Sequence, residues 1–220
     1  MEPMTVQSYA RRWPYSLLAA VLCGCASSVP IEATFPKPLI EAVPMRVGVL
    51  FDNELTSFEY EEQLPQNSKW SIQLGDANVA MFDPLFNSMF AHTESVANVP
   101  LEESQWGTLD VIIKPLVDKF EFDVPSGSDA KFVEVWVRYK LQVYQPDGKL
   151  VLDWPVVGYG KAETGLLNNQ GSLHRAAVRA LREVGANVAT EFATQPELGQ
   201  WLKENEDETQ LSADQLPPQS

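Results

Sequence analysis

Residues 132–144 read FVEVWVRYKLQVY, and this stretch decides the fold class. Apolar residues occupy every second position from Val133 to Val143, while the positions between them are mostly polar. Because neighbouring side chains of a β-strand point to opposite faces, the pattern predicts a strand with one buried and one open face. Trp136 falls among the polar positions and is therefore expected on the open face.

The segments on either side complete a sheet. Three of them are predicted as strands: residues 45–51, 110–124 and 150–162. Residues 55–75 are predicted as irregular, with a short strand at 71–74 as the alternative for that part. The turn Gln145-Pro146-Asp147-Gly148 predicts a hairpin after residues 132–144, because tight turns favour Pro, Asp and Gly. Pro115 and Pro155 indicate an edge or a bulge in two of the strands.

Two other segments carry apolar residues at helical spacing. The first begins near Asp76, which can cap it, and Pro84 predicts a kink; the alternative is two helices that meet at this proline. The second is longer, with Ser172 as its predicted cap and an apolar stripe from Ala176 to Phe192. The element order predicts an α+β fold: a two-layer sandwich in which a mostly antiparallel sheet of about four to five strands carries two helices on one face.

The N-terminus has the parts of a secretory signal peptide. Arg11 and Arg12 precede an apolar run, which is shorter than the roughly 20 residues that span a bilayer as a helix. The sequence Leu22-Cys23-Gly24-Cys25 resembles the bacterial lipobox. That resemblance implies cleavage between Gly24 and Cys25 and acylation of Cys25, and two or more acyl chains hold a protein stably on a membrane.

The lipobox resemblance also implies a location. Ala26 follows the cysteine, where an Asp would signal retention in the inner membrane, so we expect the periplasmic side of the outer membrane. The covalent lipid on Cys25 would be the only non-protein group, and no cofactor is expected. The predicted organisation is a signal peptide over residues 1–24, an extended proline-containing tether over 25–44, one α+β domain over 45–203, and a disordered acidic tail over 204–220.

The net negative charge of the chain argues against nucleic acid as a partner. Residues 1–24 hold one acidic and two basic residues, so the mature chain would carry 29 acidic and 14 basic residues and a net charge of −15. Nucleic-acid binding needs Lys and Arg to replace phosphate counterions, and is therefore not expected. The same charge repels anionic lipid surfaces, which leaves the lipid as the predicted means of membrane attachment.

Residues that could do catalysis or bind metal are few. His92 and His174 are far apart in the sequence and match no ligand spacing, so surface or capping roles are expected. Five carboxylates lie between Asp52 and Glu62, but without the spacing of a calcium loop; a solvated loop is the preferred interpretation, and a cation site the alternative. Cys25 would be the only cysteine left in the mature chain. The chain is therefore predicted not to be an enzyme and to hold no metal.

A binding surface is the more productive hypothesis. Tryptophan on an open sheet face is a candidate anchor for a partner, although packing under a loop is the alternative for Trp136. Phe58, Tyr60 and Trp70 lie in the segment 55–75, predicted as irregular, and are candidates for the same surface.

The predicted architecture resembles that of a group of periplasmic lipoprotein domains. Its features are the strand Met45–Phe51, a helix ending in Phe86-Asn87-Ser88-Met89-Phe90, the hairpin at Pro146-Asp147-Gly148 and the final Ala-rich helix. The group includes the curli-secretion and Pel-polysaccharide lipoproteins and the N-terminal domain of the Tol-system propeller protein. The resemblance implies a non-enzymatic binding or assembly subunit of an envelope complex or export system, with protein partners and often a homo-oligomer. The alternative is a carrier or sensor of a small apolar ligand held between sheet and helices.

Overall fold

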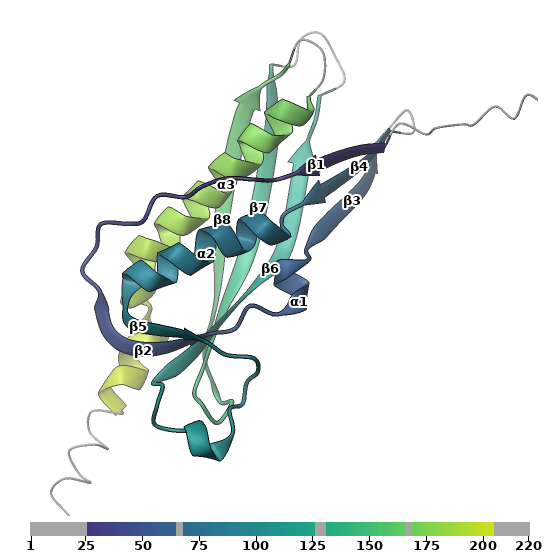
Figure 1. Cartoon of the computed structure of the whole chain (residues 1–220). Helices are drawn as coiled ribbons and strands as arrows, with labels where there is room; N and C mark the ends of the chain where they lie inside the picture. The colour runs from purple at the N-terminus through teal and green to yellow at the C-terminus, as the bar shows by residue number, and fades with distance from the viewer. Residues whose placement is uncertain (1–25, 65–67, 126–130, 166–168, 205–220) are drawn as a thin grey trace, which may run out of the picture.

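The fold is built on one large sheet. The structure, a computed structural model, describes residues 26–64, 68–125, 131–165 and 169–204. The large sheet has the strand order β5-β2-β6-β7-β8, and helices α2 (Gly75–Met89) and α3 (Gln170–Glu191) cover one of its faces (Figure 1). Its strands are β2 (Val43–Val49), β5 (Phe90–Ser95), β6 (Val111–Asp123), β7 (Phe132–Tyr144) and β8 (Leu150–Glu163). The α+β prediction, with five strands in this sheet and helices on one side, is confirmed.

β7 lies inside the sheet, as its alternation predicted. Its odd-numbered residues from Val133 to Val143 are buried, and its even-numbered residues are exposed or half-buried. β7 pairs antiparallel with β6 and with β8 along almost its whole length. The hairpin between β7 and β8 turns at Gly148, whose φ of 92° is a conformation that glycine adopts without strain.

The sheet is mixed, because its other end is parallel. β2 pairs parallel with β5 on one side and with residues 111–113 of β6 on the other. Pro115 lies just beyond this short pairing, where β6 has no second hydrogen-bonded neighbour, and Pro155 lies in the edge strand β8. Both prolines therefore lie where their strand has a strand neighbour on one side only, so that a missing N–H on the other side costs no ladder bond.

The two long helices begin at other residues than those predicted. α2 (Gly75–Met89) has Leu74 at its N-cap position and continues through Pro84 as one helix, while Asp76 lies in its first turn. α3 (Gln170–Glu191) has Asn169 at its N-cap position. Ser172 is not the cap: it is buried in the first turn, and its hydroxyl donates to the Glu163 carbonyl at 2.6 Å.

α3 lies unusually close to β8, because both present small residues to each other. A Cβ atom added to Gly158 would lie 2.1 Å from the Ala180 carbonyl oxygen, and one added to Gly160 would lie 2.0 Å from that of Ala176. These distances leave no room for any side chain at either glycine.

The outer edge of β8 is covered by side chains of α3. The Tyr159 N–H donates to the Glu183 carboxylate at 2.8 Å, and the Asn187 amide donates to the Val157 carbonyl at 3.0 Å. Arg179 donates to the Lys161 carbonyl. The three helix residues are spaced by four and so lie on one face of α3, opposite alternate residues of the strand.

A second sheet extends the helix-covered side. It has the order β1-β4-β3, with β1 (Ala26–Pro30) parallel to β4 (Ser68–Gln73) and β3 (Glu59–Leu64) antiparallel to it. A short helix, α1 (Asn53–Thr56), precedes β3, and two short 3-10 helices lie at Glu103–Gln105 and Phe192–Thr194. The segment 55–75, predicted as irregular, is therefore mostly strand.

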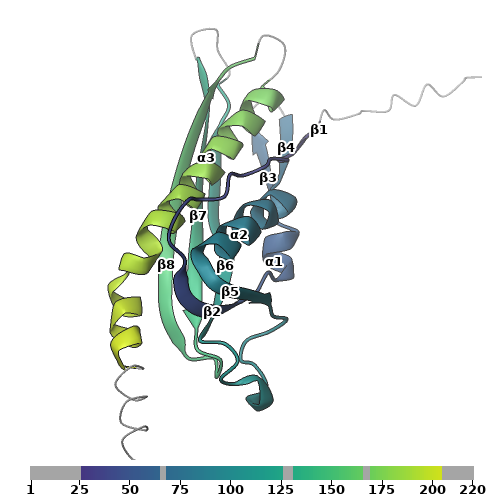
Figure 2. The same ribbon diagram turned by 60° about the vertical axis from the view of Figure 1, so that its left-hand side comes forward.

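This second sheet corrects the predicted tether over residues 25–44. Residues 26–30 form a strand, and Val29 and Ile31 are buried in the core. The strand β1 pairs with an edge of β4 that would otherwise be open, and the side chains of Val29 and Ile31 cover apolar surface of the core. Residues 31–42 then cross α3, run beside α2 and pass its C-terminal end before β2 begins (Figure 2). The folded domain thus includes residues 26–44 of the predicted tether.

The space between sheet and helices is filled by aromatic rings. Phe82 and Phe86 stack with their centroids 5.4 Å apart, and the Tyr139 ring meets Phe82 edge-on at 5.2 Å. The buried Tyr139 hydroxyl donates to Asn78, whose amide in turn donates to the Leu55 carbonyl at 2.9 Å. Burial raises the pKa of Tyr139, so this hydroxyl stays a donor.

Candidate functional site

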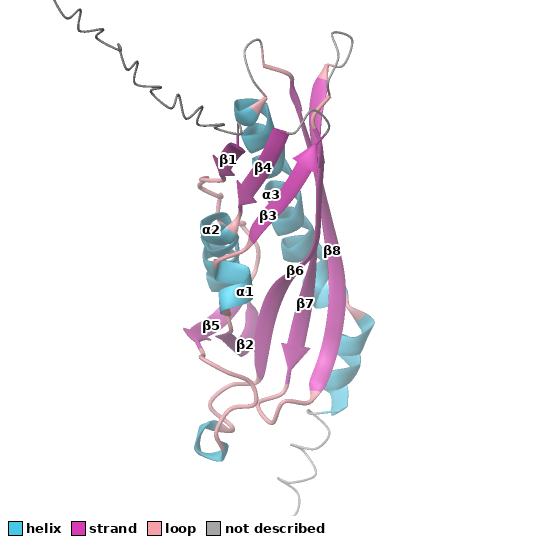
Figure 3. Cartoon of the chain, turned by 90° about the vertical axis from the view of Figure 1, so that its right-hand side faces the viewer, coloured by secondary structure: helices cyan, strands magenta, loops and turns pink. Residues whose placement is uncertain are grey.

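The open face of the large sheet is the candidate site. Figure 3 shows α3 passing behind the long strands β6, β7 and β8, with α1 and α2 beside them. The face on the other side is formed by the even-numbered residues of β7 and their register partners: Trp136, for example, lies between Glu121 of β6 and Tyr159 of β8. The prediction that Trp136 points to this open face is confirmed by its burial pattern.

Four side chains form an aromatic and aliphatic patch at one end of this face, the open-face patch: Phe132, Trp136, Val157 and Tyr159. The Trp136 and Tyr159 rings lie 5.3 Å apart and inclined by 38°. Trp136 is 37% exposed, Phe132 41% and Val157 50%. Large apolar side chains with this exposure on adjacent strands are typical of a binding surface.

Charged groups frame the open-face patch. The Lys161 ammonium lies 5.1 Å from the centre of the Phe132 ring, within the range of a cation–π contact. The Tyr159 hydroxyl donates to the Glu134 carboxylate. This hydrogen bond is the main reason why the pKa of Tyr159 is raised, since ionisation would place two negative charges side by side.

Ion pairs border the open-face patch, because Arg138 lies opposite Val157, and they continue along the rest of the face. Asp118, at the bulge of β6, binds Arg138 and also Lys140 at 3.1 Å, and the hydrogen bonds from these cations lower the pKa of Asp118. Lys114 binds Asp52 at 2.8 Å. Burial disfavours the charged form of Asp52, but the hydrogen bonds from Lys114 and the Leu55 N–H outweigh this and lower its pKa. The patch is therefore confined to one end.

The four aromatic residues predicted to share one surface lie on two sides of the sheet. Phe58 and Tyr60 pack against the core on the helix-covered side, and the Tyr60 ring lies 5.2 Å from that of Phe120. Trp70 is only 7% exposed and contacts Phe122. The prediction of a common surface is wrong for these three, because their apolar rings cover the ends of the large sheet that α2 and α3 leave open.

Phe132, Val157 and Tyr159 were not singled out from the sequence. Phe132 has the same parity as Trp136, and the hairpin at Gly148 places Tyr159 opposite Trp136. The alternation of side chains along β7 and the register of the β7–β8 hairpin are together enough to place all three residues on the open face.

The remaining polar candidates have structural partners or lie on the surface. His92 is exposed on β5, 3.8 Å from Glu94, and His174 Nε2 lies 3.0 Å from the Glu32 carbonyl. Four of the five acidic residues between 52 and 62 also have side-chain partners, such as Lys69 for Glu61 at 2.8 Å. In the described ranges, no group of three or more His, Cys, Asp or Glu side chains could hold a metal ion.

A broader hollow of about 650 Å³ lies at the other end of the molecule, near the β7–β8 hairpin. Trp106 and Trp201 line it together with the ion pair of Arg46 and Asp110. Both Asp110 oxygens are engaged by Arg46, one by its side chain at 2.7 Å and one by its backbone N–H at 2.8 Å. This pair therefore serves to hold β2 to the start of β6.

The predicted lipidation site, Gly24 and Cys25, lies outside the described residues, as does the acidic tail after residue 204. None of the described helices is long and apolar enough to span a membrane.

Comparison with known proteins identifies the fold but no family. No protein-family model and no curated protein matches the chain. Among solved structures, the chain is similar to a protein from Helicobacter pylori named as a homologue of the neuraminyllactose-binding hemagglutinin. The TM-score is 0.51 at 10% identity, over 80% of this chain and 100% of that chain. At this identity the similarity shows a shared fold only.

Two further structures have lower scores. A minor lipoprotein from Acinetobacter baumannii has a TM-score of 0.40 at 6% identity, over 68% of this chain and 93% of that chain. A PelC dodecamer from Paraburkholderia phytofirmans has a TM-score of 0.36 at 12% identity, over 71% of this chain and 92% of that chain. These scores do not establish a common fold with the present chain.

Proposed function

We propose that the chain is a lipoprotein anchored through Cys25 to the periplasmic side of the outer membrane, and that it is a non-enzymatic binding or assembly subunit of an envelope complex. The observation that supports this most is the open-face patch, in which Phe132 and Trp136 of β7 and Val157 of β8 are 41%, 37% and 50% exposed on the face that the helices leave uncovered. The lipobox of residues 22–25 supports the anchor.

The partner is expected to be a protein. Exposed aromatic rings bordered by charges of both signs, here Glu134, Glu121 and Lys161, are typical of the centre and rim of protein interfaces. An anionic lipid surface fits less well, because the mature chain would carry a net charge of −15. A second copy of this chain is the other protein that could cover the patch.

A photo-crosslinking amino acid placed at Phe132 tests the proposal in intact cells. We expect a specific adduct that forms at residue 132 and disappears when Trp136→Ala is added, since removing a central aromatic side chain typically costs about 2 kcal/mol or more of binding free energy. The adduct mass distinguishes another envelope protein from a second copy of the chain.

The matched control is the same probe at Asp153, which faces Gln142 on the same side of the sheet at its ion-paired end. An adduct that forms equally at both positions, or one that survives Trp136→Ala, would contradict the patch as partner surface. The proposal would also be contradicted if the protein were recovered only as an uncrosslinked monomer and the Trp136→Ala variant behaved like the parent chain in vivo.

The alternative function, a carrier of a small apolar ligand, was predicted for the space between sheet and helices. Phe82, Phe86 and Tyr139 occupy that space. Any such ligand would therefore have to bind elsewhere on the domain.

A further inference from the structure

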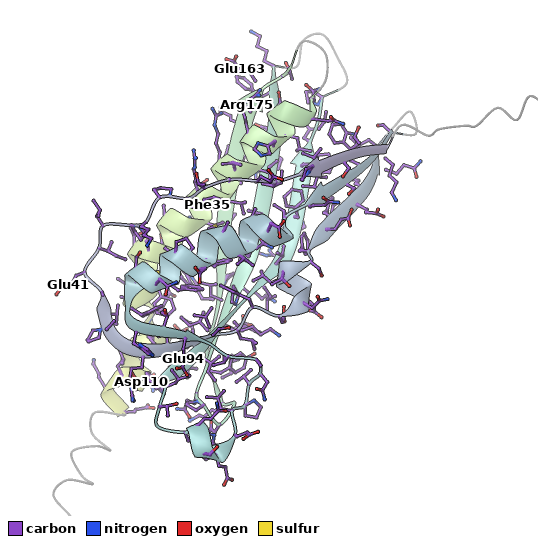
Figure 4. All side chains as sticks on the ribbon, in the orientation of Figure 1. Phe35, Glu41, Glu94, Asp110, Glu163 and Arg175 are labelled. Atoms are coloured by element: carbon purple, nitrogen blue, oxygen red, sulfur yellow. The ribbon has the colours of Figure 1, made fainter. Side chains whose placement is uncertain are left out.

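An apolar cleft of about 260 Å³ lies on the outer side of the two helices. Residues 35–38 form one wall where they cross the helices, and Figure 4 shows Phe35 at this crossing. Met81 and Leu85 of α2 line it as well, and both are buried. The cleft is separate from the open-face patch, which lies across the sheet.

The crossing segment and α3 supply two walls of the cleft. The crossing segment is fixed at its start, because the buried Ile31 donates its N–H to the Gln73 carbonyl at 2.9 Å and His174 contacts the backbone of Glu32. On the other wall, α3 contributes Gly185, and a Cβ atom added there would meet only Met81, at 3.8 Å. A methyl group at Gly185 would therefore lie in ordinary van der Waals contact with Met81, without overlap.

Charge around the cleft indicates the kind of ligand. The two charged residues that line it, Lys37 and Arg182, are both cations, although the chain has 30 acidic and only 16 basic residues. Neither forms an ion pair with any residue in the described ranges. An apolar floor with two free cations at its rim is complementary to an apolar molecule with an anionic end.

The volume of the cleft limits the size of the ligand that it can hold. A volume of 260 Å³ exceeds the roughly 150 Å³ of an apolar cavity that holds benzene. It is smaller than the roughly 300–1,000 Å³ of pockets for drug-sized ligands. One alkyl chain fits this space, whereas the two chains of a phospholipid do not.

We propose that this cleft binds a fatty-acid anion. The alkyl chain lies against Phe35, Met81 and Leu85, and the carboxylate accepts hydrogen bonds from Lys37 and Arg182, which are the strong, charge-assisted kind. The site is independent of the proposed partner surface, so either proposal can fail while the other stands.

Calorimetric titration with dodecanoate below its critical micelle concentration tests the site. The protein is the whole chain after its predicted signal peptide, residues 25–220, with Cys25→Ser so that no covalent lipid competes. We expect saturable binding of one dodecanoate per chain. Shortening the probe should weaken binding by about fourfold for each methylene removed. Dodecyltrimethylammonium, with the same tail and a cationic head, should bind at least tenfold more weakly.

Two variants localise the binding. Gly185→Leu fills the cleft and should abolish dodecanoate binding. The double reversal Lys37→Glu with Arg182→Glu should weaken it at least tenfold, while the matched control Lys131→Glu, an exposed lysine outside the cleft, should leave it unchanged. Thermal melts show whether each variant is folded.

The proposal is overturned if dodecanoate shows no saturable binding, if the anionic and cationic probes bind equally, or if Gly185→Leu binds like the parent chain. The comparison of the two head groups uses the unaltered cleft. It therefore decides the question even if the Gly185→Leu chain does not fold.

Discussion

Gly160 sets the distance between the sheet and its longest helix. An added Cβ would lie 2.0 Å from the backbone oxygen of Ala176, and backbone of a packed helix cannot move aside without shifting the rest of α3. We therefore expect Gly160→Ala to destabilise the fold by about 3 kcal/mol, the upper end of typical overpacking costs. Urea unfolding would measure it as a lower midpoint at unchanged slope.

Gly199 is the matched control for this substitution. It lies in the helical residues 196–204, and nothing lies within 4 Å of the position where its Cβ would be. Gly199→Ala should stabilise the protein slightly, by about 0.5–1 kcal/mol, because alanine loses less backbone entropy in a helix. Equal effects of the two substitutions would mean that helix α3 does not contact β8 as closely as described.

Single residues also show what sequence alone could locate. Trp136 could be assigned to the open face, because alternation along one strand fixes the side on which each residue lies. Trp70 could not be placed, since its burial depends on contact with Phe122, 52 positions away in the chain. Ser172 was expected to cap a helix, yet its hydroxyl binds the end of β8 at Glu163, a contact that no local pattern specifies.

At the scale of elements, helix α3 protects the edge strand β8. Arg179, Glu183 and Asn187 occupy backbone groups of β8 that would otherwise be open to pairing with another chain. Replacing all three with alanine should remove about 1 kcal/mol of stability per hydrogen bond and expose the strand edge. We expect concentration-dependent self-association, measured as a rise in mass by sedimentation.

Arg182→Ala serves as the control on the same helix, because Arg182 makes no hydrogen bond to β8 in the described structure. If the triple variant keeps the mass distribution of the parent chain at every concentration, these side chains do not guard the edge.

The strands that sequence analysis missed share a physical cause. β5 has one buried residue, Phe90, and β1 has Val29 as its one residue described as buried, so neither shows the alternation that marks a strand. β3 alternates only between exposed and half-buried positions. These strands are specified by the neighbours with which they pair, whereas the long strands β6, β7 and β8 bury enough apolar surface to be visible in the sequence.

At the scale of the whole molecule, the central expectation is the lipid anchor. Cys25→Ser should abolish labelling by a clickable fatty acid and move the protein out of the membrane fraction, because the acyl chains would be the anchor and the acidic mature chain is repelled by anionic lipid surfaces. Cys23→Ser is the matched control, since Cys23 would leave with the signal peptide and labelling should persist. Labelling that survives Cys25→Ser would place the lipid on another residue.

The pairing of β1 with β4 has a mechanical consequence. If the anchor is on Cys25, any force that draws the domain away from the membrane enters the fold at Ala26, the first residue of β1. Load along the strand is shared by the whole ladder from Ala26 to Pro30, whereas load across the sheet opens its bonds one at a time. The direction of pull would thus decide whether β1 holds or peels off, and with it how far the domain can travel from its lipid.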